Sequence, residues 1–160
     1  MLDNSGQMSD KKLMRIIGLD IGSRYIGVAI SDELGVIAQG LKTITRRSME
    51  DDLMEISLII TQFNKVDKIV VGLPKNMDGT IGKQAEMIFK WIRAAQEKIR
   101  LPFLTWDERL STVEVTKILL EADLSRKKRK RVIDKLAAAL ILQGYLNQGR
   151  KENDEPSLST

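Results

Sequence analysis

Three acidic residues occupy positions at which a carboxylate could do chemistry. Asp20 interrupts an apolar run in the segment Gly-Leu-Asp-Ile-Gly, and Glu108 follows a second apolar run. Asp134 stands in what the pattern predicts as the first turn of an apolar, alanine-rich helix. Because the chain has no histidine and no cysteine, carboxylates are its only obvious metal ligands and general bases. Oxygen ligands of this kind suit hard divalent cations such as Mg²⁺ or Mn²⁺.

Each acid also has an ordinary structural explanation. Asp20 could hydrogen-bond its own backbone in a turn, Glu108 could belong to a solvated charged turn, and Asp134 could offset the dipole at a helix N-terminus. Asp107 precedes Glu108 directly, and strand alternation would point these two side chains to opposite faces, so that one of them enters a site. Spacing alone leaves both explanations open for each acid.

Positive charge offers contacts for a polyanionic partner. The formal net charge of the chain is +4, which favours such a partner only weakly by itself. Six consecutive cations, 126–131, immediately precede the predicted Asp134 helix and would flank its carboxylate. A run of this kind is usually a solvated loop, but here Lys127, Lys128, Arg129 and Arg131 could hold phosphates. Arg109 could contact a phosphate in the same way, or could pair with a neighbouring acid.

The elements that must position these residues follow from hydrophobic spacing. The predicted strands span 15–21, 25–31, 36–44, 68–72 and 102–106. The predicted helices span 49–63, 83–100, a third that opens at a capping box at Ser111, and a last one at 132–147. Three strands in a meander followed by alternating helices and strands predict an α/β fold with a mixed five-stranded sheet flanked by helices.

The composition limits the class of protein further. A disordered leader is expected at 1–14, one folded domain at 15–148 and a disordered tail at 149–160. No apolar run reaches the roughly 18 residues that a membrane span needs. The lack of cysteine is compatible with a reducing compartment, so a cytoplasmic protein without membrane association is expected. The lack of histidine excludes a Ser-His-Asp triad, a Cys-His nucleophile and a histidine-bearing zinc site.

Four ordered motifs resemble the YqgF (RuvX) family, bacterial proteins described as pre-16S rRNA nucleases and as Holliday-junction-resolvase-like. The matching segments are 18–32, 71–74 with 77–80, 107–112, and 133–135 with 137–138 and 141–142. The resemblance covers about 15–147 and implies an RNase H-like fold with Asp20, Glu108 and Asp134 as catalytic acids. Tyr25 stands where many members carry a basic residue, and the neighbouring Arg24 is the expected substitute for that phosphate contact.

The hypothesis that follows is metal-dependent phosphodiester hydrolysis. Two Mg²⁺ or Mn²⁺ ions roughly 3.5–4 Å apart would be bridged by Asp20 and flanked by Glu108 and Asp134. The resemblance implies structured RNA as substrate, namely precursor ribosomal RNA near the 5′ end of the 16S species. A monomer or weak dimer is expected. The alternatives are a Holliday junction resolvase acting on four-way DNA and a non-catalytic RNA- or ribosome-binding protein. A sugar-kinase-like phosphotransferase is disfavoured, because the chain lacks a second lobe to close over a nucleotide.

Overall fold

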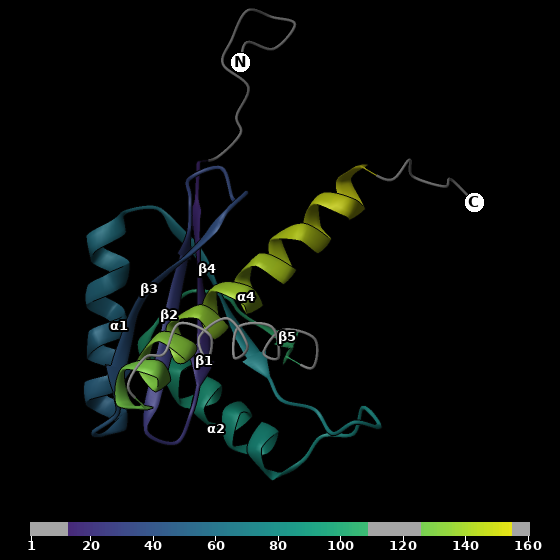
Figure 1. Ribbon diagram of the computed structural model, residues 1–160. Coiled ribbons are helices and arrows are strands. Elements are labelled where there is room, and N and C mark those ends of the chain that lie inside the picture. The colour runs from purple at the N-terminus through teal and green to yellow at the C-terminus, as the bar shows by residue number, and fades with distance from the viewer. Residues whose placement is uncertain (1–12, 109–125, 155–160) are drawn as a thin grey trace, which may run out of the picture.

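The chain forms one sheet with helices on both of its faces (Figure 1). The structure, a computed structural model, describes residues 13–108 and 126–154, and the side chains of 13–108 and 132–149. The elements are β1 (Arg15–Ile21), β2 (Tyr25–Ser31), β3 (Ala38–Thr45), α1 (Met49–Phe63), β4 (Val66–Leu73), α2 (Lys83–Lys98), β5 (Phe103–Asp107) and α4 (Arg126–Asp154). The helix predicted to open at Ser111 lies outside the described residues.

The strand order is β3-β2-β1-β4-β5. β1 pairs antiparallel with β2, and β2 pairs antiparallel with β3. On its other side β1 pairs parallel with β4, which pairs parallel with β5. This arrangement confirms the predicted mixed five-stranded sheet. It also places the carboxyl ends of β1, β4 and β5 at one end of the sheet, where open α/β sheets tend to bind ligands.

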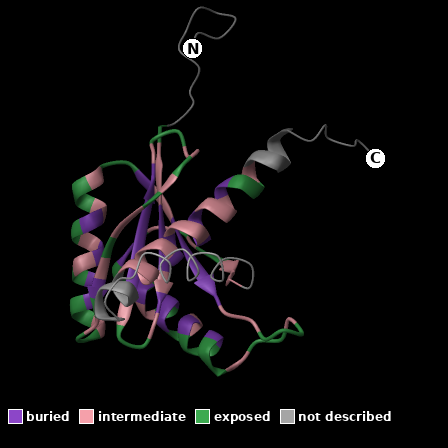
Figure 2. Ribbon diagram, viewed as in Figure 1, coloured by how far each residue is buried: buried purple, intermediate pink, exposed green. Residues whose placement is uncertain are grey.

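The sheet separates two hydrophobic cores. The burial colours show buried residues along its central strands (Figure 2). On one face α1 and α2 contribute buried residues such as Leu53, Ile56 and Ile88. On the opposite face α4 buries Ala138 and Leu142 with residues of β2 and β4. The inward residues of α1 recur every three or four positions, which is why its predicted span coincides with the observed one. No helix in the described part of the chain is long and apolar enough to cross a bilayer.

Helix α4 is longer than its hydrophobic pattern predicts. It begins at Arg126 instead of 132 and continues to Asp154 instead of 147. The backbone of the basic run is therefore helical, and its interpretation as a loop is wrong. Lysine and arginine are good helix formers, so the helix extends where no apolar stripe marks it. Its end also passes the boundary at 148 that the sequence predicts for the folded domain.

Candidate active site

Asp20 lies near the end of β1, on the sheet face that α4 covers. Gly18, two residues earlier and therefore on the same face, packs so closely on α4 that a Cβ there would lie 2.8 Å from Leu142 Cβ. Asp20 itself is half-buried, and its partner in the antiparallel register of β2 is Gly27. The carboxylate therefore lies at the carboxyl end of β1 on the face where sheet and helix meet.

Helix α4 brings Asp134 to the same position. A Cβ on Gly27 would collide with the backbone carbonyl group of Asp134, so the close approach of this helix requires glycine at 27. Because Gly27 is also the cross-strand partner of Asp20, both aspartates adjoin one glycine. The Oδ2 atom of Asp134 is buried from solvent.

The position of Asp134 within the helix corrects one expectation. The sequence predicts Asp134 in the first helical turn, where an acid stabilises the helix dipole. In the structure the described helix begins at Arg126, which places Asp134 in the third turn. The dipole effect falls off within the first turn, so it does not account for an acid at this depth.

Glu108 follows β5 directly and reaches across the neighbouring strand β4. A Cβ on Gly72 would lie 2.5 Å from Glu108 Oε1 and 2.9 Å from its Cγ, so the glutamate side chain lies over this glycine. The parallel register pairs Leu19 with Val71, which sets Gly72 alongside Asp20. Across this gap the carboxyl group of Glu108 hydrogen-bonds the Asp20 side chain.

The contact between the two acids changes the protonation of Glu108. Burial, the hydrogen bond with Asp20 and the negative charges of Asp20 and Asp107 together raise the pKa of Glu108 to about 8. Glu108 therefore holds a proton at neutral pH and donates it to the Asp20 carboxylate. Two carboxyl groups in contact share a proton because two adjacent negative charges repel each other, and a cation relieves the same repulsion.

The pair of acids fits a hard divalent cation, although the third acid does not complete a cluster. Asp20 and Glu108 supply oxygen ligands of the kind that Mg²⁺ and Mn²⁺ prefer, and a bound ion would displace the shared proton. Within 13–108 and 126–154, no three acidic side chains are grouped closely enough to form a metal cluster in this arrangement. Asp20 and Glu108 are therefore in direct contact, whereas Asp134 lies nearby with its backbone against Gly27.

Strand alternation puts Glu108, the acid that the family resemblance implies, on the face of Asp20; the residue pattern alone left open which of Asp107 and Glu108 enters a site. Phe103 of β5 packs into the core beneath α1 and α2, whereas Trp106 packs beneath α4. Residues of β5 therefore alternate between the two faces, and Glu108 contacts the face that carries Asp20. The negative charge of Asp107 contributes to the raised pKa of Glu108.

The predicted phosphate-binding residues are placed only in part. Arg24 is exposed in the turn that joins β1 to β2, a few residues after Asp20. Arg109 lies outside the described residues. Lys127, Lys128, Arg129 and Arg131 belong to the helical backbone at the start of α4, before Asp134, and their side chains lie outside the description.

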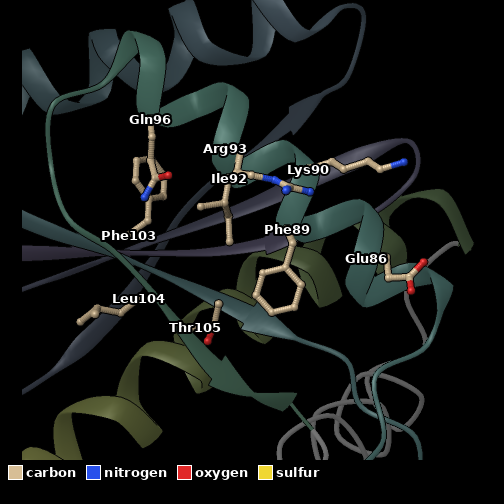
Figure 3. A pocket seen from close by; sticks show the side chains of 9 residues that line it. All are labelled: Glu86, Phe89, Lys90, Ile92, Arg93, Gln96, Phe103, Leu104 and Thr105. Atoms are coloured by element: carbon tan, nitrogen blue, oxygen red, sulfur yellow. The ribbon is translucent and has the colours of Figure 1, made fainter.

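A hollow of about 790 Å³ lies away from the acids, between α2 and β5 (Figure 3). Phe89 and Ile92 of α2 and Phe103 of β5 line it, with Lys90 and Arg93 on the same helix. None of the three predicted catalytic acids borders it. The perturbed pKa of Glu108 makes its contact with Asp20, and not this hollow, the candidate active site.

Two charged residues near the site were missed by the sequence analysis. Arg46 follows β3 and forms an ion pair with Asp52 of α1, with 3.0 Å between Arg46 Nε and Asp52 Oδ2. Asp52 is almost fully buried, with 1% of its surface exposed. The sequence contains a signal for it, because Asp52 lies three residues after Met49 and four before Ile56, on the apolar face of α1. A charge on that face requires a buried partner.

The sheet order and the acidic pair at the ends of β1 and β5 define an RNase H-like fold with an acidic site. The solved structure of T. thermophilus RuvC in complex with a Holliday junction substrate shares this fold, with a TM-score of 0.51 at 12% sequence identity. The match covers 86% of this chain and 96% of that chain. A family model described as "RuvX: Holliday junction resolvase" matches residues 14–148. The chain belongs to the RuvX family.

Curated relatives support the same assignment. A protein of Desulforamulus reducens is 56% identical over 138 residues, which covers 86% of this chain and 100% of the relative. A protein of Halothermothrix orenii is 55% identical over 138 residues, covering 86% of this chain and 98% of the relative. Both carry the name "Putative pre-16S rRNA nuclease". The family resemblance inferred from the four sequence motifs is thereby confirmed.

Proposed function

We propose that this protein is a divalent-metal-dependent nuclease that processes the precursor of 16S ribosomal RNA. The observation that carries the proposal is the direct contact between the carboxyl groups of Asp20 and Glu108. Two adjacent carboxylates repel each other, so this pair shares a proton at neutral pH, and a divalent cation can take the place of that proton. The names of the curated relatives support precursor 16S rRNA as the substrate.

The chain's own residues have three parts in this proposal. Asp20 and Glu108 would hold the cation, with Asp134 on α4 as the third candidate ligand. A divalent cation bound there supplies a Lewis acid that lowers the pKa of the attacking water and stabilises the leaving oxygen. Arg24 and the cations at the start of α4 hold the phosphate backbone by charge. No protein general base is needed, which suits a chain without histidine.

The two-metal arrangement is the form of this chemistry that we favour. Asp20 has neighbours on both sides: Glu108 hydrogen-bonds it across β4, and Asp134 adjoins its partner Gly27 from α4. A central carboxylate with an acid on each side would supply oxygen ligands to two divalent cations. Oxygen ligands alone accommodate either Mg²⁺ or Mn²⁺, so both belong in the assay.

A cleavage assay with two substrates tests the proposal. Purified protein is incubated with Mg²⁺ or Mn²⁺ and either an RNA spanning the 5′ end of 16S rRNA and its precursor sequence, or a four-way DNA junction. We expect cleavage of the RNA, and a loss of at least about a thousandfold in Asp20→Asn because the replacement removes a metal ligand. Glu97→Gln, an exposed acid on α2, is the matched control and should retain activity.

The outcomes separate the proposal from its rivals. Cleavage of the junction without cleavage of the RNA would make the protein a resolvase. RNA binding without any metal-dependent cleavage would indicate a non-catalytic binding protein. Full activity of folded Asp20→Asn would exclude the acidic pair as the catalytic centre, and circular dichroism of the variant checks that it is folded.

A further inference from the structure

An ion pair between the half-buried Arg46 and the buried Asp52 lies next to the turn that follows Asp20. The Arg46 guanidinium donates from Nε to Asp52 Oδ2 at 3.0 Å, and from Nη1 to the carbonyl oxygen of Gly22 at 2.9 Å. Asp52 lies in the first turn of α1, and its side chain is 1% exposed. One guanidinium therefore connects α1 to a residue only two positions beyond Asp20.

Arg46 also holds the far end of the same turn. Its backbone N–H donates to the carbonyl oxygen of Arg24 at 2.8 Å. Inside the turn the N–H of Gly22 donates to the carbonyl oxygen of Tyr25 at 2.9 Å. The Gly22–Tyr25 turn is thus bonded to Arg46 at two of its carbonyl groups. This turn carries Arg24 and follows directly on the strand that carries Asp20.

Stability is a poor explanation for the burial of Asp52. Removing a carboxylate from water costs several kcal/mol, and apolar residues of similar volume are often as stable as a buried ion pair. The Oδ1 atom of Asp52 is buried and accepts no hydrogen bond among the described residues, so the carboxylate is only partly compensated. What the pair provides is a fixed direction for the guanidinium. The planar guanidinium group of arginine can donate to a carboxylate and to a carbonyl oxygen at the same time. The ammonium group of lysine cannot reproduce this geometry.

We propose that Arg46 is a positioning residue, which holds the Gly22–Tyr25 turn so that Asp20 and Arg24 face the substrate correctly. Asp52 anchors the guanidinium to α1. The inference rests on the proposed nuclease function of the site. A misplacement of about 1 Å near a catalytic group can lower the rate about a hundredfold, so a rigid turn beside Asp20 has a direct catalytic consequence.

Conservative replacement of Arg46 tests this role. In Arg46→Lys the positive charge remains, but the side chain can no longer donate to Asp52 and to the Gly22 carbonyl oxygen at the same time. We expect kcat to fall about 10–100-fold with KM within about threefold of wild type, and Mn²⁺ affinity to fall about tenfold, because residues that orient metal ligands have effects of this size. Arg93→Lys, on the exposed side of α2, is the matched control and should keep kcat and Mn²⁺ affinity within about twofold.

Amide exchange gives a readout that does not depend on cleavage. In Arg46→Lys, which keeps a positive charge for the buried Asp52, the amides of 21–25 should exchange at least about fivefold faster, with those of β4 and α2 unchanged, because the bond to the Gly22 carbonyl group is lost. Wild-type kcat, Mn²⁺ affinity and exchange in Arg46→Lys would overturn the proposal. Faster exchange across the whole sheet, with a matching fall in Tm, would overturn it too, because Arg46 would then support the fold in general. If the wild-type protein cleaves nothing, the proposed function fails, and Mn²⁺ affinity and exchange still decide whether Arg46 positions the turn.

Discussion

The carboxyl groups of Asp20 and Glu108 are joined by a hydrogen bond although a whole strand, β4, separates the strands that carry them. The bond is made possible by Gly72, whose missing side chain leaves the space that Glu108 crosses. Acids from the two sides of β4 thus converge at one end of the sheet. Their contact has consequences for stability and for metal binding.

The stability of the metal-free protein should depend on the charge of Glu108. Its pKa is about 8 in the folded protein and near its ordinary value of 4.5 in the unfolded chain. Between these values the folded state binds the additional proton, so this group stabilises the fold at low pH, and its contribution is lost as the pH rises towards 8. We expect Glu108→Gln to remove that loss and to be more stable than wild type at pH 8 by roughly 2–4 kcal/mol, at 1.36 kcal/mol for each pKa unit.

Urea denaturation at pH 5 and pH 8 in the presence of a chelator measures this effect. The wild-type protein should lose more stability between the two values than Glu108→Gln does. Glu97→Gln, an exposed site on α2, should follow the wild type and serves as the control. Parallel pH profiles for wild type and Glu108→Gln would show that the contact with Asp20 does not perturb Glu108.

Metal binding should release the proton held by Glu108. At pH 6.5 Glu108 is protonated, because its pKa is about 8, and a cation that binds its carboxylate must displace that proton. Titration calorimetry with Mn²⁺ in buffers of different ionisation enthalpy should report about one proton released at pH 6.5 and almost none at pH 9.5. The apparent affinity should rise with pH up to about 8 and then level off. Mn²⁺ binding without proton release at pH 6.5 would place the cation elsewhere.

The close packing of α4 on the sheet should make Gly27 intolerant of substitution. A Cβ at this position would overlap the backbone of α4 at Asp134, and a backbone segment cannot move aside as the end of a side chain can. We expect Gly27→Ala to lower the free energy of unfolding by about 2–4 kcal/mol and to displace the helix that carries Asp134. Activity should fall together with stability.

A second glycine provides the control for that experiment. Gly149 also lies in α4, but a Cβ there would meet nothing within 4 Å. Gly149→Ala should stabilise the helix by up to about 1 kcal/mol, because alanine has the higher helix propensity. Urea denaturation of both variants tests the contrast, and equal effects at 27 and 149 would mean that the helix does not pack on Gly27 as described.

Regular hydrophobic spacing made most of the elements predictable. The observed span of α1, Met49–Phe63, coincides with the predicted one, since its buried residues recur at helical intervals beside a polar face. The extension of α4 to Arg126 and to Asp154 was not predictable in this way. Its ends consist largely of charged residues, which favour a helix but form no apolar face. Hydrophobic spacing therefore does not predict them.

The sequence by itself determined the kinds of groups available: carboxylates without histidine or cysteine, with two of the acids at strand ends and one on a helix. Only the tertiary structure decided which of them touch. Contact between Asp20 and Glu108 requires that β4 lie between their strands with a glycine at 72, and strand order is a long-range property that local spacing does not encode. The same holds for Arg46 and Asp52, whose pairing beside the Asp20 turn exists because β3 and α1 fold back on the end of β1.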